Sequence, residues 1–312
     1  MFAFRYLTDG PLLSVTELPQ LGGNINGPSL IRCPDWVRNP PASYMLYFAH
    51  HEGRSIRLAL SDSLQGPWRL HEPAPLELEA SNFAIRAPEM QELDPEARDF
   101  VERGEDGLYP HIASPDAWVD HERRQIRLYY HGRLDNGLQR TRVALSADGL
   151  RFSACDEIIA TSYLRLFRHQ DWFYAITMPA QLYRSRDGLA DFEQGPRLTE
   201  EPIRHHALLY DDARWYLLWT RVGDTPERIL VSELLTGPDW RRWRLGEPAE
   251  VHRARRDWEG ADLPAEASRY GAVMQRVNQL RDPAVFSENG RHFLLYAYAG
   301  EQGIAIGELQ RT

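Results

Sequence analysis

One stretch near the start of the chain carries the pattern of the fold. Tyr44-Met-Leu-Tyr-Phe-Ala-His50 is followed by Ser55-Ile-Arg-Leu-Ala-Leu-Ser61 and then by Asp62-Ser-Leu-Gln-Gly-Pro-Trp68. The first two segments are rich in strand-forming residues and the third in turn formers. The stretch therefore predicts strand, loop, strand and tight turn, after which an aromatic residue opens another strand. The same order recurs in four further copies, which begin at Ile126, Trp172, Trp215 and His292.

The spacing of these copies predicts the architecture. The serine that ends the second strand recurs as Ser61, Ser146, Ser185 and Ser232, so the steps are 85, 39 and 47 residues. The two shorter steps match a four-stranded blade of roughly 40 to 50 residues. Five copies thus predict an all-β, five-bladed β-propeller of four-stranded antiparallel blades, forming one domain over residues 1–312. We expect residues 1–15 to pair with the last blade and close the ring.

Two insertions interrupt the repeat, at about 78–110 and 249–280. Long loops in a compact domain are usually functional, so we expect both to cover the funnel. The first contains Asp94-Pro95-Glu96, an opening typical of a short helix.

Composition excludes several classes of protein. Lys and Arg number 36 and Asp and Glu 45, which gives a net charge of −9 and argues against nucleic acid or an anionic membrane as partner. No apolar run approaches the roughly 18 residues of a membrane span, and no leader pattern is recognisable, so a cytoplasmic protein is expected. Cys33 and Cys155 fall in different copies, and two free thiols are expected.

Polar residues concentrate where the loops of a propeller meet. The loops that lead into the inner strands share one face with the loops that join second and third strands, so their side chains converge. Acids, histidines and arginines are frequent there and in the insertions. The expected substrate-binding residues are Asn26, His51, Arg86, His111, Tyr163, Arg165, His206, Arg221, Trp258, Asp262, Arg281 and Glu301.

Short motifs add a family resemblance. Ser114-Pro-Asp-Ala-Trp-Val119, Arg281-Asp-Pro-Ala-Val-Phe286 and the repeated Ser-x-Asp-Gly turn resemble those of the five-bladed furanosidase superfamily. This group includes glycoside hydrolase families 43, 32, 62, 117 and 130. In family 43 an Asp-Pro motif of blade one supplies the general base. A Pro-Asp motif of blade two supplies an acid-tuning aspartate, and a Glu-Gly motif supplies the general acid.

The resemblance implies a glycoside hydrolase, with an oligosaccharide or glycoside as substrate. Asp116 resembles the tuning aspartate, and Glu259 resembles the acid that protonates the leaving oxygen. Asp282 joins Asp116 in orienting substrate or activating water. Inverting chemistry is implied, with acid and base roughly 6.5 to 9.5 Å apart. The pattern departs from the family at Gly27, which occupies the place of the base.

Other readings stay open. In a family 130-like phosphorylase the funnel arginines and histidines would bind phosphate, whereas a non-catalytic sugar-binding propeller would explain Gly27. No cofactor is expected and no metal site is predicted. A site from His51, His111 and His206, or a structural calcium or other divalent ion in the channel, is an alternative. The oligomeric state cannot be deduced from the sequence.

Overall fold

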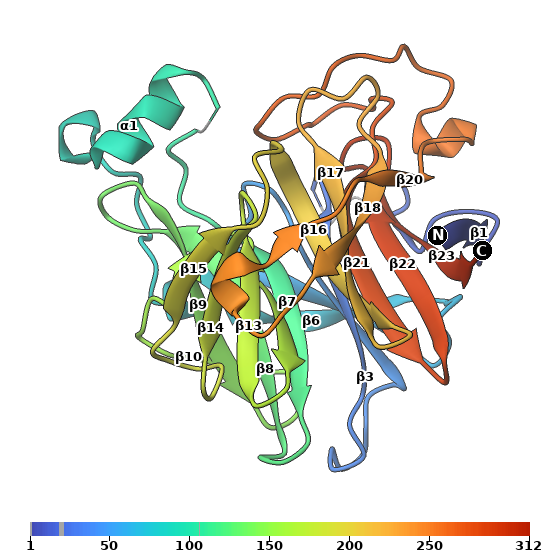
Figure 1. The fold of residues 1–312 in the computed structure, drawn as a ribbon, viewed down its shortest axis with the longest axis horizontal. Helices are drawn as coiled ribbons and strands as arrows, with labels where there is room; N and C mark the ends of the chain where they lie inside the picture. The colour runs from blue at the N-terminus through green and yellow to red at the C-terminus, as the bar shows by residue number, and fades with distance from the viewer. Residues whose placement is uncertain (1, 19–21, 106) are drawn as a thin grey trace.

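The computed structural model describes residues 2–18, 22–105 and 107–312, and it confirms the five-bladed propeller (Figure 1). Five antiparallel sheets, numbered here as blades I to V, are built from strands in the following order, innermost first. Blade I contains β3 (Asn26–Arg32), β4 (Tyr44–Ala49), β5 (Ser55–Ser61) and β6 (Arg69–Glu77). Blade II contains β7 (Ile112–Asp120), β8 (Gln125–Arg133), β9 (Gln139–Ser146) and β10 (Ser153–Ala154). Blade III contains β12 (Arg165–His169), β13 (Trp172–Thr177), β14 (Gln181–Ser185) and β15 (Glu193–Arg197). Blade IV contains β16 (Ile203–Asp211), β17 (Arg214–Arg221), β18 (Ile229–Leu235) and β19 (Arg244–Leu245). Blade V contains β21 (Arg281–Glu288), β22 (Arg291–Ala297), β23 (Gly303–Arg311) and β1 (Phe2–Tyr6).

The core of the molecule lies between blades. Each of the five interfaces between neighbouring blades has its own cluster of buried apolar side chains. Strand β4 shows how one strand serves two interfaces. Leu46 and Phe48 face blade V, whereas Met45 and Tyr47 face blade II, because alternate side chains of a strand point to opposite faces. The apolar runs of the repeat are therefore second strands that are buried on both sides.

The N-terminal strand closes the ring, as expected. β1 pairs antiparallel with β23, from Phe2 opposite Arg311 to Tyr6 opposite Gly307, and β2 (Leu13–Ser14) pairs with the other end of β23. Met1 lies outside the described residues. Figure 1 shows the two ends of the chain side by side at this blade. The pairing gives the last blade its outer strand, so that β23 has no open edge along these residues.

The repeated serine shapes the turn that ends the third strand of blades I, II and III. In blade II the Ser146 hydroxyl accepts hydrogen bonds from the backbone N–H groups of Asp148 and Gly149, at 3.3 and 2.8 Å. The Asp148 carboxylate in turn accepts from the N–H of Leu150 at 2.8 Å. Serine and aspartate are common in such turns because they satisfy backbone donors locally.

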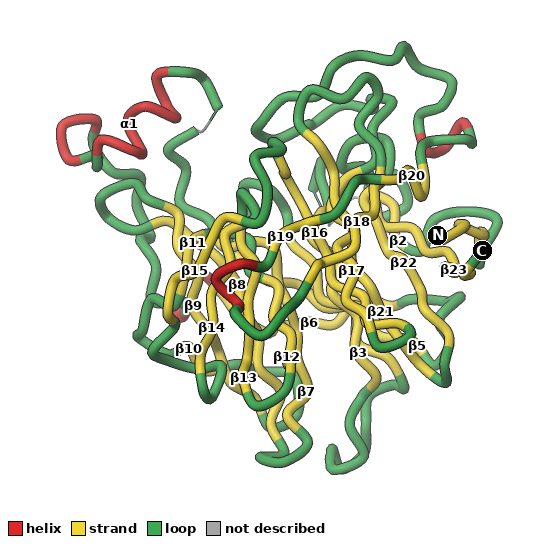
Figure 2. Tube along the Cα trace, viewed as in Figure 1, coloured by secondary structure: helices red, strands yellow, loops and turns green. Residues whose placement is uncertain are grey.

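Both insertions lie at the top of the view in Figures 1 and 2, where Figure 2 shows mostly loop. The first holds η2 (Leu78–Ala80), η3 (Met90–Glu92) and α1 (Pro95–Glu102), whose start is capped by Asp94 as the sequence predicts. The second begins with β20 (Ala249–His252), which pairs with β18, and η5 (Asp257–Glu259), and continues as a long loop to β21. The remaining short elements are β11 (Ala160–Thr161), which pairs with β9, and η4 (Trp240–Arg242).

Two further expectations can be compared with the structure. Cys33 and Cys155 are both free thiols, as predicted. Within the described ranges, no helix is long and apolar enough to cross a membrane.

Candidate functional site at the channel mouth

The five inner strands β3, β7, β12, β16 and β21 contact one another around the centre and all begin at the same face, here called the channel mouth. Four of them change pairing register near their first residues. Gly27, Ser114, Tyr163 and Asp282 have positive φ at or just before these starts. Three of these residues stand before proline in blade I, II or V. The bulges turn the chain so that residues from different blades meet at the mouth.

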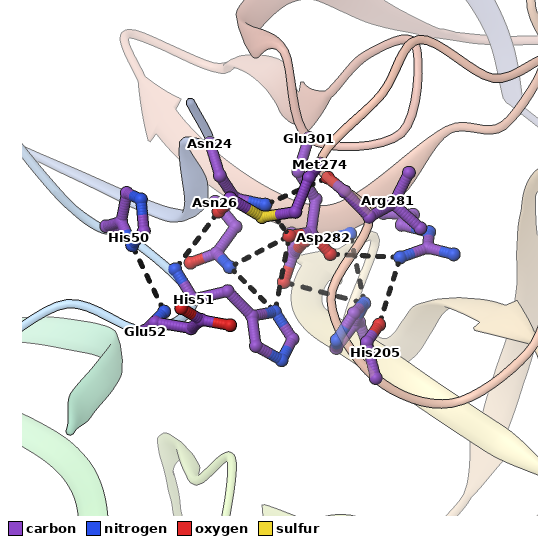
Figure 3. A network of polar contacts seen from close by, with 12 residues as sticks. Asn24, Asn26, His50, His51, Glu52, His205, Met274, Arg281, Asp282 and Glu301 are labelled. Atoms are coloured by element: carbon purple, nitrogen blue, oxygen red, sulfur yellow. Dashed lines mark hydrogen bonds and ion pairs between the residues drawn. The ribbon is translucent and has the colours of Figure 1, made fainter. Parts of the chain in front are cut away.

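Asp282 is the central acidic group of the mouth (Figure 3). Asp282 is only 2% exposed. Its Oδ1 accepts a hydrogen bond from the Tyr163 hydroxyl at 3.1 Å, and its Oδ2 has no partner among the described residues. Burial, together with the charge of Glu301, raises the pKa of Asp282 to about 7. This carboxyl is therefore substantially protonated near neutral pH.

His205 contacts Asp282 as a neutral imidazole. The Asp282 backbone N–H donates to Nδ1 of His205 at 3.4 Å, and the imidazole stacks on Tyr163 with ring centroids 4.7 Å apart. Burial lowers the pKa of His205 well below its usual range. The ring is thus neutral, and its Nδ1 accepts while the proton resides on Nε2. The 3.5 Å separation between Nδ1 and the Asp282 carboxylate is a close contact rather than an ion pair.

Glu301 is the opposite case. It is fully buried, and its Oε1 accepts from Arg281 at 2.9 Å. Its Oε2 accepts from the amide of Asn24 and lies 3.2 Å from Nδ1 of His51. Burial alone would raise the pKa of Glu301, but the charges of His51 and Arg281 and the hydrogen bond from His51 hold it well below its usual range. Glu301 is a fixed anion that positions its neighbours.

Two buried arginines complete the network and fasten the second insertion. Arg281 lies 3.2 Å from Glu227 and donates two hydrogen bonds to Gln279. Arg204 donates to the carbonyls of Arg269 and Gly271 in the long loop before β21. Asn24 donates in the same way to the carbonyl of Val273 at 3.0 Å. Channel side chains therefore tie this loop over the mouth.

The loop also approaches the first insertion. A methyl group at Gly271 would lie 3.8 Å from the carbonyl oxygen of Glu105. The end of the first insertion and the second insertion therefore approach each other at this point. Met274, on the same loop, is 48% exposed, and Figure 3 draws it with the residues of this network.

Asp116 and Arg165 form a second polar pair, on the inner strands of blades II and III. Asp116 accepts from the backbone N–H of Leu166 at 2.9 Å, and its other oxygen lies 4.0 Å from the Arg165 guanidinium. Its side chain is 19% exposed. Burial raises the pKa of Asp116, opposed by Arg165 and the Leu166 N–H. Arg165 is 3% exposed, donates to the carbonyl of Pro115 and leaves Nε and Nη2 without partners in the described chain.

Several histidines surround these groups. The rings of His111 and His131 are 5.6 Å apart, and Tyr109 lies beside His111 and His51. Burial and the nearby positive groups lower the pKa of His131 well below its usual range. His206 binds the carbonyl of Ile176 at 3.0 Å, and burial lowers its pKa to about 3. Among the residues with described placement, no group of three or more His, Cys, Asp or Glu side chains is arranged as a metal site would require.

The expectation for Glu259 requires correction. Glu259 does not lie at the mouth, because its hydrogen-bond partners lie on β1 and β22 of blade V, on β20 of blade IV and in the loop that follows β20. Its carboxylate accepts from five donors: the hydroxyls of Tyr6 and Tyr296, Nε2 of His252, and the backbone N–H groups of Arg255 and Arg256. Burial opposes ionisation, but the hydrogen bond from His252 and those of the tyrosines lower the pKa of Glu259 to about 2. A carboxylate so stabilised is not a proton donor near neutral pH.

Four other expected binding residues also lie outside the network. Trp258 packs edge-on against Tyr298, with centroids 5.1 Å apart, and adds to the core between blades IV and V. Asp262 pairs with Arg276 inside the second insertion, and Arg221 pairs with Glu201. Arg86 is exposed on the first insertion.

Six residues of the expected set therefore meet in one network: Asn26, His51, Tyr163, Arg281, Asp282 and Glu301. The other four lie at or next to inner strands: Asp116, His111, Arg165 and His206. Arg204 and His205 lie next to His206 at a channel-entry position but are not among the expected binding residues, and reasoning from sequence missed Glu227 altogether. His205 could have been found, because adjacent histidines on a strand face opposite ways and one of the pair must differ from His206 in its partners. Glu227 precedes a strand and carries no signal in the sequence.

Comparison with known proteins gives one sequence relative and several structural ones. No family model matches the chain. The "Uncharacterized protein R118" of Acanthamoeba polyphaga mimivirus is 32% identical, over all of this chain and 91% of its own length.

Solved structures that resemble this fold include family 43 enzymes. CoXyl43, a β-xylosidase/α-arabinofuranosidase from a compost microbial metagenome, superimposes with a TM-score of 0.61 at 14% identity, over 99% of this chain and 96% of its own. The GH43_1 enzyme from Xanthomonas citri superimposes with a TM-score of 0.61 at 12% identity, over 97% of this chain and 90% of its own. At such identities the likeness concerns the fold.

Proposed function

Because this chain belongs to the same protein family as the mimivirus protein R118 and has the propeller fold of family 43 glycoside hydrolases, we propose that it hydrolyses glycosidic bonds at the channel mouth. The observation that carries the proposal is Asp282. A carboxyl that is protonated near neutral pH and has an unpartnered oxygen is suited to donate a proton to a leaving oxygen. Asp282 thus takes the acid role that Glu259 cannot fill.

The position of Asp282 gives this assignment further support. Gly27 and Asp282 both precede proline at the register change of an inner strand, in blades I and V. A Cβ atom on Gly27 would lie 2.9 Å from the Cα of Ser114, so blade I has no room for a carboxylate there. Blade V supplies a carboxyl at the equivalent bulge, where positive φ and burial are accommodated.

The second carboxylate of the proposal is Asp116. Burial raises the pKa of Asp116, but the Leu166 N–H and Arg165 oppose this shift and favour the carboxylate, and one oxygen makes no direct hydrogen bond that would occupy it. In the proposed reaction Asp116 activates water while Asp282 protonates the leaving oxygen, with inversion at the anomeric carbon. His111 and Arg165 would hold sugar hydroxyl groups.

The test is hydrolysis of a panel of glycosides, followed by proton NMR of the released anomer. CoXyl43 was solved with xylotriose and the Xanthomonas citri enzyme with xylose, so pentose-containing oligosaccharides are the first substrates to try. We expect turnover with the inverted anomer released first. Sugar binding without turnover of any panel member would instead identify a non-catalytic binding propeller, the alternative that Gly27 favours.

A second candidate, a glycoside phosphorylase, is favoured by Arg165. Its buried Nε and Nη2 have no partner in the described chain, and a guanidinium with two unpartnered nitrogens suits a phosphate oxyanion. The same panel with inorganic phosphate distinguishes the two. A phosphorylase would release sugar 1-phosphate only when phosphate is present, and Arg165→Gln would abolish that dependence.

A further inference from the structure

A separate cavity of about 470 Å³ lies on blade II, outside the channel mouth. It opens between residues 82–85 of the first insertion and the connection between β8 and β9. Phe83, Ile85 and Leu134 form its apolar wall, and Asp135, Asn136 and Arg142 supply polar groups. None of these residues belongs to the mouth network. The volume is within the range of pockets that hold small molecules.

Arg142 is the unusual residue of this cavity. It is 9% exposed, and its guanidinium lies 5.1 Å from the ring centre of Phe83. Its Nε and Nη1 have no hydrogen-bond partner in the described chain. Buried guanidinium N–H groups are rarely left without acceptors, because the charged group loses its water and gains nothing in return. A carboxylate is the acceptor that best matches such a group.

The other polar residues indicate what such a ligand carries beside its carboxylate. The Asn136 side chain accepts from the backbone N–H of Leu138 through Oδ1, which leaves its amide N–H groups for a ligand oxygen. Asp135 is exposed and can accept from hydroxyl groups. Ile85 is 50% exposed and offers an apolar surface to a ring face.

We propose that this cavity binds a sugar acid, with its carboxylate on Arg142 and its hydroxyl groups on Asp135 and Asn136. The site does not depend on hydrolysis at Asp282, because the two places share no residue. Binding at the cavity and turnover at the mouth can therefore fail separately.

The test measures binding of D-glucuronate by ligand-observed NMR titration, with D-glucose as the uncharged match. We expect glucose to bind at least about tenfold more weakly, and Arg142→Gln to weaken glucuronate by about tenfold or more. Arg140→Gln is the matched control, since Arg140 lies in the same strand but does not line the cavity. It should leave binding unchanged.

A second variant protects the test against misfolding of Arg142→Gln. Ile85→Glu places a negative charge at the exposed wall and should also weaken glucuronate by about tenfold, whereas Leu235→Glu, at an exposed position of blade IV, should not. Equal binding of glucose and glucuronate would overturn the proposal. So would glucuronate binding that survives Ile85→Glu, or that is lost in Asp282→Asn but kept in Arg142→Gln.

Discussion

At the scale of single residues, two buried carboxyls of the mouth differ in charge because their partners differ. Glu301 lies beside Arg281 and His51 and accepts from Asn24, so its negative charge is compensated. Asp282 accepts only the Tyr163 hydroxyl, and it also faces the charge of Glu301. Burial of Asp282, together with the negative charge of Glu301, raises the pKa of Asp282 to about 7, although Arg204, Arg281 and His51 oppose the shift. This division gives the mouth one fixed anion and one titrating acid.

The raised pKa of Asp282 predicts how activity changes with pH. An acid catalyst is active while protonated, so kcat/KM should fall as the pH rises through about 7. The measurement is kcat/KM between pH 5 and 9 on one glycoside. A profile that stays level from pH 6 to 8 would remove Asp282 from the acid role.

The same shift predicts that Asp282→Asn does not unfold the protein. The folded-state pKa lies above the unfolded-state value of 3.8, so the folded state binds more protons and loses stability as the pH rises between the two values. Asparagine mimics the neutral form. At pH 7.5 we expect a Tm equal to or above that of the wild type, measured by differential scanning calorimetry. A markedly lower Tm would show that the folded protein does not disfavour the ionised form of Asp282.

Substitution of Glu259 should lower the stability of the fold rather than remove a catalytic group. Glu259→Gln removes the charge that five donors stabilise, and it should lower the free energy of unfolding by about 3 kcal/mol, the usual scale for a broken buried charge network. Urea unfolding measures it. Glu266→Gln, at an exposed position of the same insertion, is the control and should change little.

The effect of Glu259 should depend on pH. Its folded-state pKa, about 2, lies below the unfolded value near 4.5. Its contribution is therefore complete above pH 4.5 and is lost as the pH falls toward 2. The wild-type and Glu259→Gln proteins should differ most near neutral pH and converge in acid. A difference that is the same at pH 3 and pH 7 would contradict the assignment of an ionised Glu259.

The sequence could predict the convergence at the mouth but not the roles within it. Loop position alone brings Asn26, His51 and Asp282 together, because the topology of a propeller dictates it. The Glu-Gly motif misled at Glu259, since a sequence does not show that tyrosine hydroxyls from β1 and β22 will surround that carboxylate. The pKa of a buried acid depends on such distant partners, so it cannot be deduced from neighbours along the chain.

At the scale of elements, the start of β3 explains why blade I carries glycine. Gly27 has φ of +58°, and its position lies against the backbone of β7. Gly27→Asp, which would restore a carboxylate there, should instead lower the free energy of unfolding by about 3 kcal/mol from strain and overlap. Urea unfolding should show this loss.

The matched control for that substitution is Gly237→Ala. A Cβ atom on Gly237 would meet no described atom within 4 Å other than those of its chain neighbours, and the residue does not have a positive φ. The change should therefore be nearly neutral. A stable Gly27→Asp protein would show that β3 and β7 can separate, and it would weaken the argument that the acid has to come from blade V.

At the scale of the whole molecule, the ring depends on its two ends meeting. β1 and β2 both pair with β23, and Phe2 and Phe4 pack into the core between blades IV and V. A chain lacking residues 1–15 should lose its single cooperative thermal transition and aggregate, because β23 becomes an open edge. Circular dichroism on heating tests this. A truncated chain that melts in one transition near the wild-type Tm would contradict the closure.

The whole fold was the most predictable feature, for a physical reason. Strands that are buried on both faces, such as β4 and β22 from Phe293 onward, must be apolar there, and the turns between strands need serine, aspartate and glycine. These demands repeat in every blade, so they are visible in the sequence. The split of outer strands into pairs such as β19 and β20 follows from irregular loops and is not visible there.

The central claim is that Asp282 protonates the leaving group, and its most direct test compares leaving groups. We predict that Asp282→Asn lowers kcat by roughly 10²-fold or more on glycosides with poor leaving groups, the usual worth of general acid catalysis. On aryl glycosides whose leaving groups need no proton, the loss should be much smaller. Equal losses on both kinds of substrate, or no loss on either, would contradict the claim.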